Sequence, residues 1–175
     1  MKRTLASAML LHLGCGAPPE APPGPSTFVA TVEDLAPFMR WTAFPLGELS
    51  AGGHPQGRQT VYVSRPRPPG AVAFPVGAML VRTIEVGPSP RTWEVFAMAK
   101  RGGDYNQDGA RGWEFFLLSL SDSGSVRIIA RGQNPTSGHE DRYTLGENTT
   151  CNSCHGLEDA RPYDSVLSLP LRPGR

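Results

Sequence analysis

This chain of 175 residues has few cysteines and almost no net charge. Its three cysteines, at positions 15, 151 and 154, are too few for a small scaffold held together by disulfides. No hydrophobic run is long enough for a polytopic membrane protein. The 17 basic and 16 acidic residues give a formal net charge of +1, whereas nucleic-acid-binding proteins usually have a clear basic excess. We therefore expect one domain with no nucleic-acid partner.

Lysine is also scarce, whereas glycine and proline are abundant. Lys2 and Lys100 are the only lysines, so 15 of the 17 basic residues are arginines. The 20 glycines and 18 prolines bring the composition close to the low-complexity range. A hydrophobic content of 39% is still enough for one modest core. The composition predicts a small, loop-rich globular domain.

Residues 1–14 have the pattern of an export signal. Lys2 and Arg3 provide a positive start, and a short apolar run follows and ends just before Cys15. The pattern resembles a bacterial lipoprotein signal, in which this cysteine is lipidated, although His12 replaces the usual small aliphatic residue. We expect an exported, periplasmic protein tethered to the membrane through Cys15. A plain secretory signal with a stray cysteine and an ordinary cytosolic N-terminus are the alternatives.

Residues 15–27 are rich in proline, with five prolines in the eleven residues after Cys15. Proline lacks a backbone donor and has a fixed φ, so this stretch cannot join the interior of a helix or sheet. It predicts an extended tether between the anchor and a folded domain of residues 28–175.

The folded domain is predicted to be mainly β, of the α+β class. Alternating and β-branched residues separated by turn residues indicate five strands. These strands are residues 59–64, 78–86, 92–100, 113–120 and 125–131. Short connections between them favour a curved, antiparallel sheet of five strands, with a few short helices, one of them near residues 33–40.

The alternation also separates the two faces of the predicted sheet. Phe96 and Met98 share one face of their strand. In the preceding strand, Arg82 shares a face with the apolar residues Leu80 and Ile84. A charge on an apolar face needs a partner.

The C-terminal segment carries a C-x-x-C-H motif. Cys151, Cys154 and His155 have the spacing by which c-type haem is attached. Two thiols on one side of a helical turn bond to the two vinyl groups of one porphyrin, and the adjacent histidine is the proximal iron ligand. We therefore expect one covalent haem c bound by the C-terminal segment. A zinc site and a redox or structural disulfide are the weaker alternatives.

Six stretches resemble the cytochrome P-460 family, which includes the β-type cytochromes c′. They are Arg58 with residues 61–63, residues 74–81, 95–100 and 112–115, the C-x-x-C-H motif, and residues 164–167. Three positions depart from the family's usual residues: Ser64 replaces asparagine, Arg82 lysine, and Ser165 tyrosine.

This resemblance implies a β-sheet subunit, usually dimeric, with one c-type haem and an open distal site. It implies binding of nitric oxide, or oxidation of hydroxylamine or nitric oxide, together with a redox partner protein. Whether the chain is an enzyme or a gas-binding protein stays open. P-460 members have a covalent bond from a lysine to the porphyrin, and the only candidate here is Lys100. A solvated strand end is the favoured alternative for Lys100.

Four further residues are candidates for the site. Arg82 and Arg58 are candidates to contact a haem propionate or a distal ligand, with structural ion pairs as the alternative. Glu94 and Glu114 are candidate proton acceptors in an enzymatic version.

A second hypothesis is an electron-transfer cytochrome with a six-coordinate haem. The available sixth ligands are Met39, Met79, Met98, His54 and His139. Both histidines lie in polar loops, so we expect them to be exposed, and we expect the methionines in the core. Phenylalanines 44, 96, 115 and 116 are candidates for an apolar pocket wall.

Overall fold

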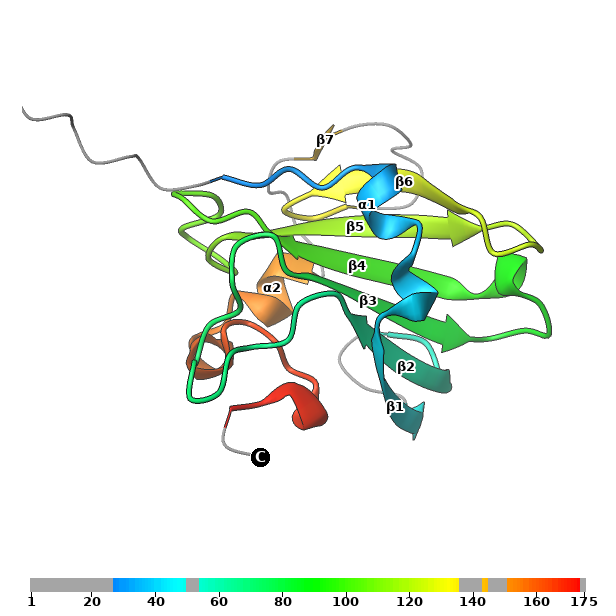
Figure 1. Cartoon of the computed structure of the whole chain (residues 1–175), viewed down its shortest axis with the longest axis horizontal. Helices are drawn as coiled ribbons and strands as arrows, with labels where there is room; N and C mark the ends of the chain where they lie inside the picture. Colours follow the sequence, from blue (N-terminus) through cyan, green and yellow to red (C-terminus); the bar gives the residue numbers. More distant parts are fainter. Residues whose placement is uncertain (1–26, 50–53, 136–142, 145–150, 174–175) are drawn as a thin grey trace, which may run out of the picture.

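The domain is built on one open, mainly antiparallel sheet (Figure 1). The computed structural model describes residues 27–49, 54–135, 143–144 and 151–173. Six antiparallel strands follow one another in chain order, and the two-residue β7 pairs in parallel with β6. The strands are β1 (Thr42–Leu49), β2 (Gly57–Val63), β3 (Met79–Glu85), β4 (Glu94–Lys100), β5 (Trp113–Leu120), β6 (Val126–Gly132) and β7 (Tyr143–Thr144).

The prediction of a mainly β fold is confirmed, and so are its five strands, which correspond to β2–β6. The predicted number of strands was wrong, because β1 precedes them at the edge of the sheet. β1 contains Pro45 and Gly47, which are unusual in strands, so the sequence pattern did not indicate it. The register between β1 and β2 shifts between these two residues. An edge strand tolerates such residues because one side of its backbone needs no ladder partner.

The predicted signal peptide, residues 1–14, lies outside the described residues. The predicted tether, residues 15–27, does so too except for its last residue. No helix within the described ranges is both long and apolar enough to cross a membrane.

A short helical segment crosses one face of the sheet (Figure 1). It consists of α1 (Val32–Leu35) and the 3₁₀ helix η1 (Phe38–Arg40), which replace the single helix predicted near residues 33–40. Thr31 and Asp34 form a capping box that starts α1. Pro37 separates the two turns, since proline disrupts a helix interior.

The sheet separates two hydrophobic cores, which we call the outer core and the inner core. The outer core lies under α1 and η1 and contains Leu35, Phe38, Val81, Val95 and Phe116. The inner core lies on the opposite face and contains Val61, Leu80, Met98, Trp113, Phe115, Val166 and Leu171. Because strand residues alternate, neighbouring positions such as 115 and 116 belong to different cores.

The inner face is covered by the C-terminal segment, which comprises α2 (Cys151–His155), η3 (Glu158–Tyr163) and η4 (Leu169–Leu171). This segment is orange to red in Figure 1 and lies at one end of the strands. The sheet thus brings Cys151 of the C-x-x-C-H motif against the inner core, which includes side chains as distant in the sequence as Val61.

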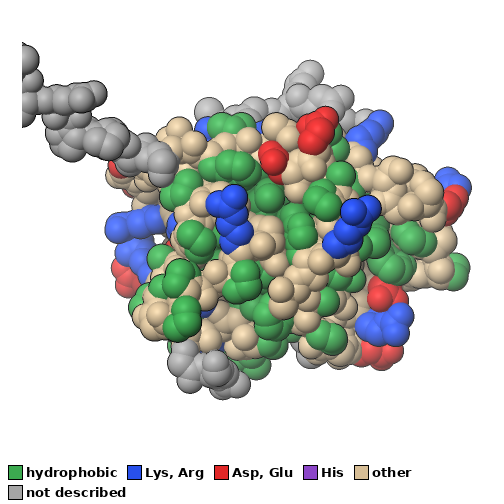
Figure 2. All heavy atoms as spheres, viewed as in Figure 1, with side chains coloured by type: hydrophobic (Ala, Val, Ile, Leu, Met, Phe, Trp, Pro, Cys, Tyr) green, Lys and Arg blue, Asp and Glu red, His purple; other side chains and the backbone are tan. Residues whose placement is uncertain are grey.

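Charged side chains are scattered on the face that carries α1. Figure 2 shows that Lys and Arg side chains stand apart on this face, between hydrophobic and uncharged polar surface. They form no continuous basic patch there among the residues that are drawn in colour.

Candidate functional site

Helix α2 is anchored to the fold through Asn152, the residue after the first cysteine. The Asn152 side-chain oxygen accepts hydrogen bonds from the Ala110 backbone N–H at 2.8 Å and from Asn106 Nδ2 at 2.9 Å. The backbone N–H of Asn152 donates to Asn134 Oδ1 at 2.9 Å. These bonds fix the orientation of the motif against the loop that precedes β5 and against the segment that follows β6.

Two glycines allow this close approach. A Cβ atom placed on Gly156 would lie 2.5 Å from the Asn152 carbonyl oxygen and 2.9 Å from the Cα of Gly109. A Cβ atom on Gly109 would overlap the Asn152 side chain. Only residues without a side chain fit at these two positions.

A cavity of about 1130 Å³ lies between α2 and the inner face of the sheet. This volume is slightly above the range of about 300–1,000 Å³ for small-molecule pockets. Most of the lining side chains are apolar. They include Leu46, Val61, Leu80, Phe96, Met98, Phe115, Leu117, Val166 and Leu167.

Cys151, Cys154 and His155 all line this cavity. Both cysteines are half-buried thiols. The donor set of two thiols and one imidazole beside a large apolar space fits a haem c group. Cys151 and Cys154 would form its covalent attachment, and His155 would be its axial ligand.

The hydrogen bond at His155 defines its tautomer. His155 Nδ1 lies 2.6 Å from the Ser165 carbonyl oxygen, which can only accept, so Nδ1 carries a proton. The neutral ring then has its lone pair on Nε2, the arrangement of a metal ligand. Burial lowers the pKa of His155; the hydrogen bond to Ser165 opposes this effect, and the charge of Arg82 adds to it.

The Lys100 ammonium group is not exposed to solvent, so the favoured prediction of a solvated strand end was wrong. Its ammonium group forms an ion pair with Asp164, and both side chains are nearly buried. Lys100 Nζ also donates to the Arg111 carbonyl oxygen at 2.9 Å. The prediction failed because the partner is 64 residues away in the sequence and arrives with the C-terminal segment.

Arg82 lies on the inner face and lines the cavity. The sequence predicted that this charge needs a partner, and the partner is the Gln59 side chain. The Gln59 oxygen accepts from Arg82 Nε at 2.9 Å and also from its Nη2. Burial lowers the pKa of Arg82. In the described part of the chain, no carboxylate forms an ion pair with this guanidinium.

His54 also lines the cavity, so the prediction that it is exposed was wrong. Its ring is half-buried and packs edge-on against Phe96, with 4.8 Å between the ring centroids. Burial, together with the charges of Arg82 and His155, lowers its pKa to about 4. His54 is therefore neutral at pH 7. Its loop gave no hydrophobic pattern that could have indicated burial. His139 lies outside the described residues.

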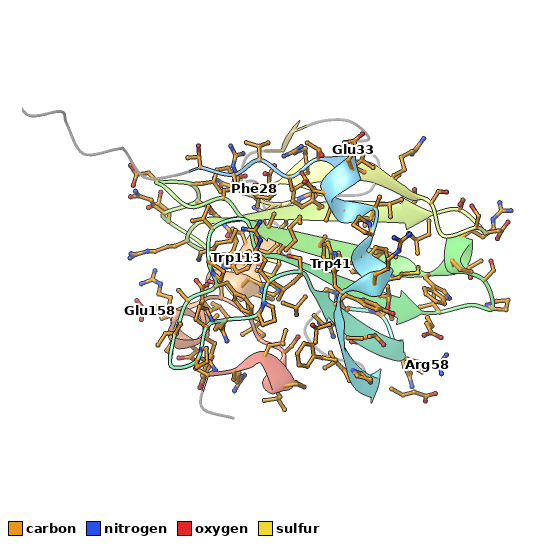
Figure 3. The ribbon with its side chains drawn as sticks, viewed as in Figure 1. Phe28, Glu33, Trp41, Arg58, Trp113 and Glu158 are labelled. Carbon is orange, nitrogen blue, oxygen red and sulfur yellow. The ribbon has the colours of Figure 1, made fainter. Side chains whose placement is uncertain are left out.

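Arg58 lies away from this cavity. It forms an exposed ion pair with Glu85 at 2.5 Å, which is the alternative that the sequence left open. Figure 3 shows Arg58 at the opposite end of the sheet from Trp113, which belongs to the inner core. The geometry gives no support to a contact between Arg58 and a ligand in the cavity.

The two candidate proton acceptors differ in their position. Glu94, the first residue of β4, is exposed and is part of the cavity lining. Glu114 is fully buried on the outer face, where it pairs with Arg131 at 2.8 Å and Arg101 at 3.3 Å. Glu114 is therefore not placed for chemistry in the cavity, because alternation along β5 directs its side chain to the other core.

The methionines and phenylalanines are also divided between the faces. Met98 lines the cavity, Met79 belongs to the outer core, and Met39 is exposed, contrary to the prediction that it is buried. Phe96 and Phe115 are part of the cavity lining, and Phe44 packs against the inner core. Phe116 also borders the cavity, but it belongs to the outer core.

Comparisons with family models, with curated proteins and with solved structures find no significant match to this chain. Within the described ranges, the structure contains no group of three or more His, Cys, Asp or Glu side chains that could hold a metal ion by themselves.

Proposed function

We propose that this domain binds one haem c covalently through Cys151 and Cys154, with His155 as the axial ligand. The observation that carries the proposal is the convergence of both thiols and the imidazole on one large, mainly apolar cavity. Haem would supply an iron that changes oxidation state and binds a small ligand. The lipoprotein-like start of the chain agrees with such a protein, since haem c is attached outside the cytoplasm.

The proposed activity is binding or oxidation of small nitrogen species such as nitric oxide or hydroxylamine, as in proteins of the cytochrome P-460 type. The apolar side chains around the cavity exclude water from the reacting ligand. Arg82, held by Gln59, offers N–H donors to an anionic group, either a haem propionate or a ligand. Glu94 at the rim is the remaining candidate proton acceptor from the sequence.

The covalent attachment is tested by single cysteine variants of the exported protein. We expect Cys151→Ser and Cys154→Ser each to lose one thioether bond, and the double variant to lose all covalent haem, measured by intact mass. Cys15→Ser is the matched control, since it removes the third cysteine and leaves the motif intact. Covalent haem in the double variant would contradict the proposal.

His54 gives specific support to a second candidate, a six-coordinate electron-transfer cytochrome. A neutral imidazole in the same cavity as His155 is a suitable sixth ligand. The two candidates differ in the optical spectrum of the reduced protein before and after addition of nitric oxide. A sharp low-spin spectrum that nitric oxide leaves unchanged, and that His54→Gln abolishes, would favour electron transfer.

A further inference from the structure

A nearly buried ion pair connects Lys100, the last residue of β4, to Asp164 in the C-terminal segment. The Lys100 side chain is 11% exposed and that of Asp164 is 12% exposed. Lys100 is fixed on its own side by the Arg111 carbonyl oxygen, and its ammonium group lies 4.9 Å from the centroid of the Trp113 ring. Contacts with the sheet and the loop before β5 therefore fix the position of the Lys100 ammonium group.

Asp164 in turn is fixed at three further atoms. Its Oδ2 accepts from the Phe74 backbone N–H at 2.8 Å. Its carbonyl oxygen accepts from Trp113 Nε1 at 2.8 Å, and its backbone N–H donates to the Arg161 carbonyl oxygen at 3.0 Å. With Lys100 on its other carboxylate oxygen, Asp164 has little freedom to rotate.

The carbonyl group that accepts the hydrogen bond from His155 Nδ1 belongs to the next residue, Ser165. Asp164 and Ser165 both have left-handed backbone conformations, with φ of 53° and 62°. Residues other than glycine seldom adopt this conformation and need support from their surroundings. The contacts of Asp164 supply that support, so they determine the direction of the Ser165 carbonyl group.

We propose that Asp164, fixed by Lys100, is a positioning residue that sets the hydrogen bond from His155 Nδ1 to the Ser165 carbonyl oxygen. This inference rests on the proposed function, because it assigns the bond a role only if His155 binds iron. A strong bond at Nδ1 increases electron donation from the imidazole to the metal and stabilises the oxidised iron. The ion pair would thereby lower the reduction potential by acting through His155.

The test uses the exported, haem-loaded protein and two measurements. One is the midpoint reduction potential, and the other is the iron–histidine stretching frequency of the reduced protein by resonance Raman spectroscopy. We expect Asp164→Asn and Lys100→Met each to raise the potential and lower the frequency. Asparagine keeps the size of the side chain and an acceptor for Phe74, but it cannot form the ion pair.

Three further variants make the test specific. Lys100→Arg keeps the charge and is expected to retain the wild-type potential and frequency. The double variant Lys100→Met/Asp164→Asn is expected to show less than the sum of the two single shifts, because both residues act through one contact. Glu85→Gln removes an exposed ion pair at the other end of the sheet and is expected to change neither measurement.

The inference is overturned if the single variants lower only the melting temperature and leave the potential and the frequency unchanged. If Asp164→Asn gives no folded protein, Lys100→Met and Lys100→Arg still decide the question. Wild-type protein without covalent haem would overturn the proposed function and this inference together. Wild-type protein with haem, but with variants unchanged in both measurements, would overturn this inference alone.

Discussion

At the scale of single residues, His54 shows how a position without a sequence signal acquires a chemical role. Its ring reaches the cavity beside Phe96, and its surroundings disfavour the protonated form. In the unfolded chain the same ring has an ordinary pKa of about 6.5. The difference between these two states gives a dependence of stability on pH.

We predict that this histidine destabilises the fold as the pH falls. Between pH 6.5 and about 4 the unfolded state binds a proton that the folded state does not, so the free energy of unfolding decreases through this window. Above pH 6.5 the residue has no such effect, and below pH 4 the loss is complete. After a reduction for partial solvent exposure, we expect a loss of about 1–2 kcal/mol.

The measurement is chemical denaturation of wild type and His54→Gln at several pH values. The difference in unfolding free energy between the two proteins should change by this amount from pH 7 to pH 4. Parallel curves would show that the His54 ring is protonated equally in both states.

At the scale of elements, helix α2 depends on the contact between Gly109 and Gly156. We predict that Gly109→Ala displaces the helix, because its methyl group would overlap the Asn152 side chain and break the hydrogen bonds to Ala110 and Asn106. The fraction of protein with covalent haem should fall severalfold, as measured by intact mass. Leu157→Ala, an exposed change in the following turn, is the control. An unchanged haem fraction in Gly109→Ala would show that α2 docks in another way.

The elements also show which features the sequence could predict. Strands β2–β6 were predictable because their alternating patterns are local, and the C-x-x-C-H motif is a spacing within five residues. The hydrogen bonds of Asn152 and the ion pair of Asp164 join residues 42 and 64 positions apart. No local pattern indicates such contacts, which exist only once the C-terminal segment covers the sheet. The placement of Glu114 was predictable in principle, because alternation assigns it to the face opposite Phe115.

At the scale of the whole molecule, the buried Glu114 cluster connects separate parts of the outer face. Glu114 accepts hydrogen bonds from Arg131, and Arg131 donates to the Ala30 carbonyl oxygen at 3.1 Å, next to α1. The cluster therefore holds the N-terminal segment against β5 and β6. It lies across the sheet from the cavity.

We predict that Glu114→Gln destabilises the protein strongly but leaves the haem spectrum unchanged. Loss of one partner in a buried ion pair costs about 3–5 kcal/mol. For a chain of this size, that cost corresponds to a decrease in melting temperature of roughly 6–20 °C. Calorimetry and optical spectra of the same samples provide the measurements. The exposed pair of Arg58 and Glu85 is the comparison, and Glu85→Gln should have little effect. A changed haem spectrum in Glu114→Gln would show that the two faces are coupled.

The division into an outer and an inner core affects how the protein can evolve by amino-acid substitution. Effects of substitutions that share no partner usually add, so gains in one core can offset losses in the other. Substitutions around the cavity that change ligand binding can therefore be tolerated, because stabilising substitutions in the outer core can offset the stability that they lose. Because a single sheet separates the two cores, substitutions that change the ligand chemistry can accumulate in one core while the other maintains the stability of the fold.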